Sequence, residues 1–393
     1  MRLLAEQIRL AATDLSSHLA CRHLTTLDLS VAHGHRLAPE WRAPDLAVIQ
    51  ELGARHEAAY LEFLRSKCAS FADLRALNEQ EALRETLRCM ERGVEVIAQG
   101  SLGTGSWFGR PDVLQKVATP SRLGAWSYEV YDCKLARETK ATTVLQLCLY
   151  SALLTETQGA ELEFMHVVPP GLEFVPESYR FAEYAAYYRY VRARLEDSCG
   201  NGAASSTYPE PCEHCDVCRW FAECDARRHA DDHLSLVAGI RRQQRTQLED
   251  WKAETMAKLA ALPVPLREKP RHGSREGIER VREQARVQVQ GRAEKRLVHE
   301  PVLPIVEGTG FCRLPEPSAG DLFVDLEGDP FVGECGLQYL FGFAFTNDDG
   351  ELTYSQRWAL DREQEKKGFE WLVDEIVKRR AADPRMHVYH FGA

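Results

Sequence analysis

Four cysteines lie within thirteen residues near the middle of the chain, and no other feature restricts the possible folds as strongly. They are separated by two, two and five residues, at Cys212, Cys215, Cys218 and Cys224. Thiolates at such spacing bind zinc or an iron–sulfur cluster. A set of disulfides is the alternative, and the choice between them depends on the compartment in which the protein works.

The sequence favours a reducing compartment. The first residues show no apolar signal core, and no run of eighteen apolar residues occurs among the 393. We therefore expect a cytoplasmic protein without a membrane partner. Because cytoplasmic thiols are kept reduced, the clustered cysteines indicate a metal site rather than disulfides.

Two ligand sets are compatible with this spacing. All four clustered cysteines could bind one metal centre, or Cys215, Cys218 and Cys224 could bind it together with the distant Cys21. Both sets offer four thiolates, which suit a tetrahedral zinc ion as well as an iron–sulfur cluster. Composition does not distinguish the two sets.

The length and the hydrophobic pattern predict two or three domains of the α/β class. Helical spacing occurs over residues 3–29 (with Asp14 as an N-cap), 44–64, 142–155, 182–196, 231–262, 274–292 and 362–379. Strands are predicted at 94–102, 107–117, 126–134, 162–168, 172–181, 322–327, 337–345 and 387–391. A Gly-, Ser- and Ala-rich segment at 198–211 and a Pro- and Gly-rich linker at 301–320 interrupt this pattern.

Two aspartates and a lysine form the first candidate site. Asp132 and Lys134 are two apart on a predicted strand and therefore point to one face, where Asp112 of the neighbouring predicted strand can join them. Two carboxylates suit Mg²⁺ or Mn²⁺, and a lysine can orient or deprotonate water and offset negative charge. A surface salt bridge is the simpler explanation, but the aromatic and apolar residues of 126–131 indicate a core strand.

Three further polar residues lie near this set in the predicted elements. Gln146 and Tyr150 are four apart and share one helix face, which an ordinary amphipathic helix also explains. His56 lies on the predicted helix 44–64, where a single histidine is usually structural.

In this order, these residues resemble the RecB-like branch of the PD-(D/E)XK nucleases, in particular its iron–sulfur members, which include AddB and the nucleases of CRISPR adaptation. The family pattern is a helical His, an Asp, (Asp/Glu)-x-Lys and Gln-x-x-x-Tyr. The matching residues span roughly residues 14–225: His56, Asp112, Asp132 with Lys134, and Gln146 with Tyr150. The iron–sulfur members take one cysteine before the nuclease core and three after it, as Cys21, Cys215, Cys218 and Cys224 are arranged here.

The resemblance implies a role for each of these residues. His56, Asp112, Asp132 and the backbone carbonyl of Cys133 would bind Mg²⁺ or Mn²⁺, and Lys134 would be the catalytic lysine. Gln146 and Tyr150 would support the site or contact DNA. Cys21, Cys215, Cys218 and Cys224 would hold a structural [4Fe-4S] cluster, with Cys212 as an extra or substitute ligand. The implied activity is exonuclease-like cleavage of single-stranded DNA in repair or recombination.

The C-terminal part resembles a different nuclease family. Asp325 and Glu327 lie on one face of a hydrophobic predicted strand, as in the first motif of RNase H-like DEDD exonucleases, where both carboxylates bind metal. Solvated acids at a strand end are the simpler explanation. The predicted element order ends on a fourth strand, so we expect an incomplete unit. The pairing with a RecB-like nuclease resembles bacterial proteins that continue into a superfamily 1 helicase.

The expected organisation follows from these resemblances. Residues 1–225 would form a restriction-endonuclease-like core, a mixed sheet flanked by helices. Residues 226–300 would form a helical bridging region, 301–320 a linker, and 321–393 the truncated RNase H-like unit.

Two other functions are compatible with the sequence. A non-catalytic DNA-binding or scaffold module, stabilised by zinc or a cluster, explains the cysteines but not the order of Asp112, Asp132 and Lys134. An accessory protein with a decayed nuclease core is disfavoured by the same intact set. The net charge of −10 argues against a protein that coats nucleic acid, although it allows a locally basic groove.

Overall fold

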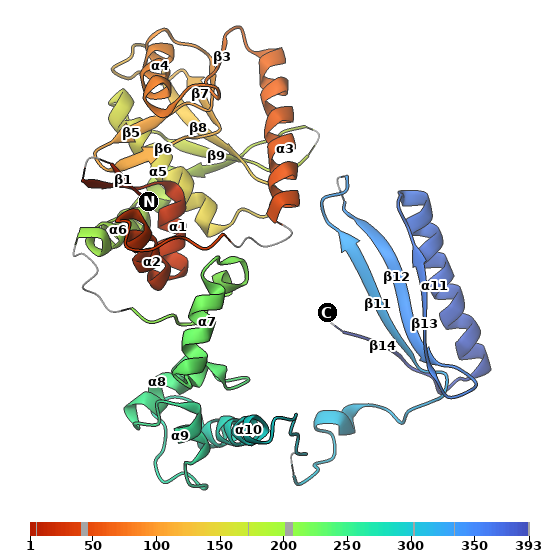
Figure 1. Ribbon diagram of the computed structural model, residues 1–393. Coiled ribbons are helices and arrows are strands. Elements are labelled where there is room, and N and C mark those ends of the chain that lie inside the picture. Colours follow the sequence, from red (N-terminus) through yellow and green to blue (C-terminus); the bar gives the residue numbers. More distant parts are fainter. Residues whose placement is uncertain are drawn as a thin grey trace. The chain divides into compact units, whose positions relative to one another are not determined.

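The computed structural model describes residues 1–4, 6–40, 46–171, 173–200, 207–301, 303–333 and 335–391. Within these ranges the chain is mixed α/β and divides into two compact units, Met1–Glu300 and Pro301–Ala393. Each unit has its own sheet (Figure 1). Each also has its own hydrophobic core. The predicted helix start at Pro44, the predicted strand start at Leu172 and the centre of the 198–211 segment lie outside the described residues.

The first unit is built on a six-stranded mixed sheet with the order β10-β9-β8-β7-β4-β3. β7 runs antiparallel to both β4 and β8, while β8 and β9 are parallel. Two hairpins, β1–β2 and β5–β6, form small separate sheets. The strands are β1 (Arg2–Leu4), β2 (Gln7–Arg9), β3 (Phe71–Asp73), β4 (Val96–Ala98), β5 (Leu102–Thr104), β6 (Trp107–Gly109), β7 (Val113–Val117), β8 (Ser127–Cys133), β9 (Phe164–Val168) and β10 (Glu177–Arg180).

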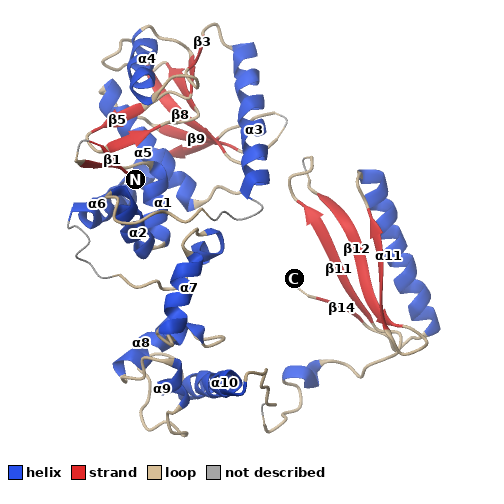
Figure 2. Ribbon diagram, viewed as in Figure 1, coloured by secondary structure: helices blue, strands red, loops and turns tan. Residues whose placement is uncertain are grey.

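Helices cover both faces of this sheet (Figures 1 and 2). On one face, α3 packs through Tyr60, Leu61 and Leu64. On the other face, α5 packs against β8 in the larger core, with α1, α4 and α6 around it. The helices are α1 (Ala12–Ala20), α2 (Arg22–Ala32), α3 (Leu46–Lys67), α4 (Glu79–Glu91), α5 (Ala141–Gln158) and α6 (Phe181–Gly200). None of the described helices is long and apolar enough to cross a membrane.

The central helix α5 is apolar on nearly every side, which explains its deep position. Eleven of its eighteen residues are buried, as expected for a helix covered by a sheet and by other helices. The helix ends at Gly159, whose φ of 66° is the left-handed conformation that commonly terminates helices.

The last residue of α5, Gln158, joins the helix to β8. Its buried side chain accepts a hydrogen bond from the Tyr128 amide at 2.8 Å and donates to the carbonyls of Tyr128 (3.2 Å) and Ala160 (3.3 Å). Gln158→Leu would leave these backbone groups buried without partners, and we expect it to lower the free energy of unfolding by about 2–3 kcal/mol. Chemical denaturation checks this, with Glu156→Leu on the exposed side of the same turn as the control. An equal loss in both variants would contradict the expectation.

Two predicted strand segments are each divided in the structure. The segment 94–102 contains β4 and reaches β5 after a break at Gln99, whose φ of 53° lies in the left-handed region and cannot continue a strand. The segment 107–117 contains β6 and β7, with Asp112 between them. Of the segment 172–181, residues 177–180 pair as β10. The strands predicted at 126–134 and 162–168 are confirmed as β8 and β9.

Two long helix predictions are wrong in part. Arg2–Leu4 and Gln7–Arg9 pair as the antiparallel strands β1 and β2 rather than starting a helix. Asp14 is not an N-cap but lies in the first turn of α1, where it accepts hydrogen bonds from the Met1 ammonium and the Ala11 amide, both at 2.8 Å. The segment 231–262 is broken because Asp232 and Lys252 adopt left-handed backbone conformations.

The rest of the first unit consists of short helices and one long helix, α10, with a small core of its own. Leu234, Leu248, Met256 and Ile278 are at its centre. The predicted helix 274–292 is confirmed as α10. The elements are the 3₁₀ turns η2 (Glu213–Val217) and η3 (Leu234–Leu236) and the helices α7 (Phe221–Ala230), α8 (Arg242–Asp250), α9 (Met256–Ala260) and α10 (Arg275–Glu294).

The second unit is a four-stranded sheet covered by one long helix (Figure 2). The order is β13-β12-β11-β14, antiparallel except that β14 runs parallel to β11. Helix α11 approaches β12 closely because Gly368 leaves room for the Phe341 ring, which would lie 2.6 Å from any Cβ there. The elements are η4 (Gly310–Arg313), β11 (Leu322–Asp329), β12 (Leu337–Thr346), β13 (Leu352–Trp358), α11 (Arg362–Ala382) and β14 (Val388–His390), which confirm the strands and helix predicted after residue 321.

Candidate functional site

The pairing of β7 with β8 brings the predicted carboxylates together. Val113 lies opposite Tyr131, so Asp112, one residue before β7, lies beside the end of β8. The amide of Cys133 donates to Asp112 Oδ2 at 2.8 Å and fixes this carboxylate against the strand that carries Asp132. Strand pairing alone therefore places both aspartates at the same end of two central strands, where β7 begins and β8 ends.

Asp132 is almost completely buried, with 1% of its surface exposed, and the lysine two residues later reaches it. The Lys134 ammonium forms an ion pair with Asp132 Oδ2. Apart from this ammonium, Oδ2 has no hydrogen-bond donor among the described residues. A buried carboxylate oxygen with an unused lone pair is well suited to coordinate a cation.

Helix α5 contributes the next two predicted residues. Gln146 Nε2 donates to Asp132 Oδ1 at 3.3 Å and to the Tyr150 hydroxyl at 3.1 Å. The Tyr150 ring lies against the backbone of Gly109, where a Cβ would come within 2.6 Å of the ring. Gly109 is therefore required for Tyr150 to reach the site. Gln146 binds Oδ1 of Asp132, whereas Lys134 binds Oδ2.

The charges around these residues are unbalanced. Burial raises the pKa of Asp112 well above its usual value, repulsion from Asp132 and Glu57 raises it further, and Lys134 opposes the shift. Burial lowers the pKa of Lys134, but attraction to Asp132 outweighs it, so this pKa lies above its usual value. When all are ionised, three carboxylates face one ammonium, an excess of two negative charges that a divalent cation would match.

His56, the other predicted ligand, contacts β9, the strand next to β8, and an aromatic ring. Its Nε2 is 3.0 Å from the carbonyl oxygen of Val168, and its ring stacks on Phe174 with centroids 5.9 Å apart. Its role as a metal ligand remains a prediction. The Cys133 side chain packs against the core under α3, while its backbone amide donates to Asp112.

Two residues that the sequence patterns did not indicate belong to this site. Gln99 donates through Nε2 to Glu57 Oε1 at 2.8 Å and to Asp112 Oδ1 at 3.1 Å. Glu57 directly follows His56 on α3, and its position next to that histidine was the one available signal. Gln99 lies in the break between β4 and β5, where no periodic pattern indicates a side-chain direction.

The second predicted site is a cavity of about 20 Å³ lined by five cysteines. Cys21 reaches it from the junction of α1 and α2, and the other four come from η2 and the start of α7: Cys212, Cys215, Cys218 and Cys224. The buried Trp220 packs on Leu24 and Leu27 and closes this region. The fold thus brings Cys21 to the clustered cysteines across about 190 residues of sequence.

The thiols of this cavity are close enough to interact electrostatically. Cys212 Sγ is 3.9 Å from Cys215 Sγ. Burial, followed by repulsion from Cys215 and Cys21, raises the pKa of Cys212 to about 11. Burial and repulsion from Cys218 raise that of Cys224 to about 11, while Arg228 opposes the shift. These thiols would lose their protons on binding a metal, which requires thiolates.

Segment 207–210, which precedes Cys212, is anchored on two sides. The Thr207 hydroxyl is 2.8 Å from His23 Nδ1 on α2. The carbonyl of Pro209 accepts a hydrogen bond from the buried Arg228 of α7 at 3.1 Å. These contacts hold the cysteine-bearing turn between α2 and α7.

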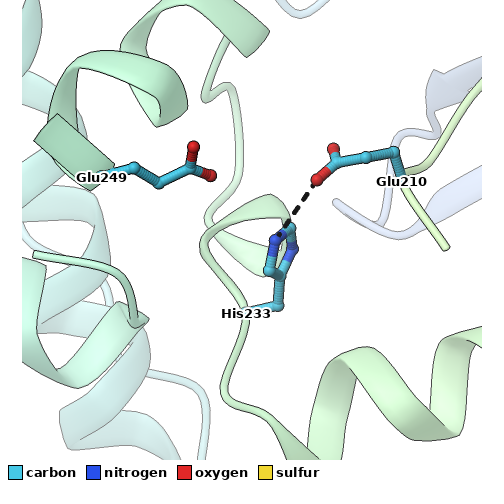
Figure 3. Close-up of side chains that lie close together, drawn as sticks. All are labelled: Glu210, His233 and Glu249. Carbon is cyan, nitrogen blue, oxygen red and sulfur yellow. Dashed lines mark ion pairs between the residues drawn. The ribbon is translucent and has the colours of Figure 1, made fainter. Parts of the chain in front are cut away.

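A histidine and two glutamates form a third cluster just beyond this segment (Figure 3). Among the described residues, Glu210, His233 and Glu249 are the one group of three metal-ligand side chains whose ligand atoms all lie within 4.8 Å of one another. Ligand atoms at this spacing could coordinate a metal ion. The hydrogen bonds around them decide whether the donor set suits one.

The hydrogen bonds of this cluster fit a protein-only network better than a metal. The Ser235 amide donates to His233 Nδ1 at 3.2 Å, so the neutral ring carries its proton on Nε2, the nitrogen that faces Glu210. The buried Arg245 already donates to Glu210 Oε2 at 2.6 Å. We therefore interpret the cluster as an anchor that joins the cysteine segment to α8.

In the second unit, Asp325 and Glu327 lie on the same face of β11, as predicted. They pair across the sheet with Gly342 and Leu340, whereas the alternate residue Phe341 packs into the core under α11. Both acids are exposed. Within the described part of this unit, no helix covers the face on which they lie (Figure 2).

No protein-family model and no curated protein matches this chain.

Proposed function

We propose that the first unit is a metal-dependent nuclease of the RecB-like, restriction-endonuclease-like type that hydrolyses phosphodiester bonds in DNA. The proposal rests mainly on one observation: Asp112, Asp132 and Lys134 lie together where β7 begins and β8 ends. Gln146 and Tyr150 extend the same hydrogen-bonded set. The unsatisfied Asp132 oxygen and the excess negative charge both favour binding of a divalent cation.

The residues of the chain divide the expected chemistry between them. A bound Mg²⁺ or Mn²⁺ ion would polarise the scissile phosphate and lower the pKa of the attacking water. Asp112 and Asp132 would hold the ion, with the Cys133 carbonyl and His56 as the remaining implied ligands. Because its pKa is raised, Lys134 stays an ammonium at neutral pH and offsets the charge that develops on the phosphate.

The substrate proposed is single-stranded DNA, and cleavage with Mn²⁺ tests it directly. Anaerobically purified protein should degrade end-labelled single-stranded DNA only when Mn²⁺ is added, and duplex DNA or RNA of the same sequence more slowly. Labels at the 5′ and 3′ ends report the polarity. Binding of the same oligonucleotide without cleavage, under conditions that load the metal, would favour the scaffold function instead.

The cysteine cavity is proposed to hold a structural [4Fe-4S] cluster with Cys21, Cys215, Cys218 and Cys224 as ligands and Cys212 as the alternative. A tetrahedral zinc site with Zn–S bonds of 2.3 Å would place its sulfurs roughly 3.8 Å apart. The Cys212 and Cys215 sulfurs are 3.9 Å apart, close to that spacing, whereas no three sulfurs of the described residues lie within 4.8 Å of one another. Metal analysis decides this: iron supports the cluster, and zinc alone opposes it.

The second unit is proposed to be RNase H-like. A central strand, two antiparallel strands, a helix and a parallel fourth strand give the order β13-β12-β11-β14, which supports this assignment. Asp325 and Glu327, exposed on one face of the central strand, are its candidate metal ligands.

A further inference from the structure

The side chain of Gln99 lies directly between two carboxylates of the site. Its amide nitrogen is 2.8 Å from Glu57 Oε1 and 3.1 Å from Asp112 Oδ1. An amide nitrogen carries two hydrogens, so it can donate to both carboxylates at once. Two like charges are thus held together by a neutral group.

The backbone of Gln99 is held in place as firmly as its side chain. Its amide donates to the carbonyl of Asp112 at 2.8 Å, and its carbonyl accepts from Arg110 Nε at 3.0 Å. Its left-handed backbone, with a φ of 53°, is one that residues other than glycine seldom adopt. Side chain and backbone together fix the amide between Glu57 and Asp112.

We propose that Gln99 takes the place of a second cation, so that this nuclease site binds one divalent ion rather than two. This inference rests on the proposed nuclease function and concerns the same site. In two-metal sites a second ion lies about 4 Å from the first and shares a carboxylate with it. Here the second position, between Asp112 and Glu57, is filled by the amide.

Size and charge both support this assignment. Mg²⁺ binds carboxylate oxygens at roughly 2.1 Å, so an ion between these two carboxylates would overlap the amide nitrogen. One divalent ion also cancels the excess of two negative charges left by Glu57, Asp112, Asp132 and Lys134. Glu57 then acts as a positioning residue: it holds Gln99, which holds Asp112.

The number of bound Mn²⁺ ions tests the proposal without any measurement of cleavage. The full chain, purified with its metal centre, is titrated with Mn²⁺, and free Mn²⁺ is counted by electron paramagnetic resonance. The double variant Asp112→Asn/Asp132→Asn serves as the blank for unrelated sites. We expect one ion above the blank in the wild type. In Gln99→Glu, which is nearly isosteric, we expect two ions, whose spectrum is broadened by coupling between neighbouring spins.

A second variant keeps the test valid if Gln99→Glu does not fold. Glu57→Gln should still bind one ion, because Glu57 is not a ligand of the first cation. Two ions in the wild type, one ion in folded Gln99→Glu, or loss of the ion in Glu57→Gln would each overturn the inference while leaving the nuclease proposal intact. A wild type that binds no more than the blank would overturn both.

Discussion

Replacing Lys134 with alanine is expected to lower the rate of single-stranded DNA cleavage about 10³-fold, the range that removal of one group acting on the transition state commonly costs. The Lys134 ammonium is paired with Asp132 where β8 ends, and its charge also acts on Asp112. Without it, the charge that develops on the phosphate would have only the metal ion as its counterion. Single-turnover cleavage with saturating Mn²⁺ measures the effect.

Folding must be measured beside cleavage, because Lys134 also pairs with a buried carboxylate. Asp132 loses its partner in Lys134→Ala, so the metal-free variant should unfold at a lower temperature than the wild type. Lys134→Arg keeps the charge pair but changes the donor geometry, and we expect it to remain folded while cleavage falls. Lys258→Ala, which removes an exposed pair with Glu254, should change neither.

Two outcomes would contradict the assigned role. Full cleavage by folded Lys134→Ala would show that the Asp132–Lys134 pair is an ordinary salt bridge. Equal loss of cleavage in Lys258→Ala would show that the assay reports stability rather than chemistry.

The sequence predicts those parts of the site that depend on local periodicity. Asp132 and Lys134 share a face because side chains alternate along a strand. Gln146 and Tyr150 meet because residues four apart are neighbours on a helix, and the structure joins them by a hydrogen bond of 3.1 Å. Neither contact requires knowledge of the tertiary fold.

Contacts between distant elements were not predictable in the same way. Gln99 and Glu57 are 42 residues apart, and they meet through a left-handed residue in a break between two strands. No periodic pattern indicates such a conformation. The β1–β2 hairpin was missed because its apolar residues Leu3, Leu4 and Ile8 also suit one face of a helix, and because tertiary contacts decide between the two.

The second prediction concerns Cys21. Cys21→Ser is expected to abolish iron binding and to lower the melting temperature by about 10 °C. The loss of a cross-link between distant segments costs up to roughly 5 kcal/mol, and each kcal/mol corresponds to about 2 °C in a unit of this size. Cys21 lies between α1 and α2, whereas the other cavity cysteines lie beyond α6. A centre that includes Cys21 therefore joins the segments before and after the six-stranded sheet of the first unit.

Cys212→Ser is the matched comparison, because Cys212 lines the same cavity and lies 3.9 Å from Cys215 Sγ. If Cys21 is the fourth ligand, Cys212→Ser keeps its iron and its melting temperature, as does the exposed Cys312→Ser in the second unit. If instead Cys212→Ser loses its iron and Cys21→Ser keeps it, the centre is local to η2 and α7. It then does not link α1 and α2 to these elements. Iron content and thermal unfolding, measured on all three variants, thus decide which segments the metal centre holds together.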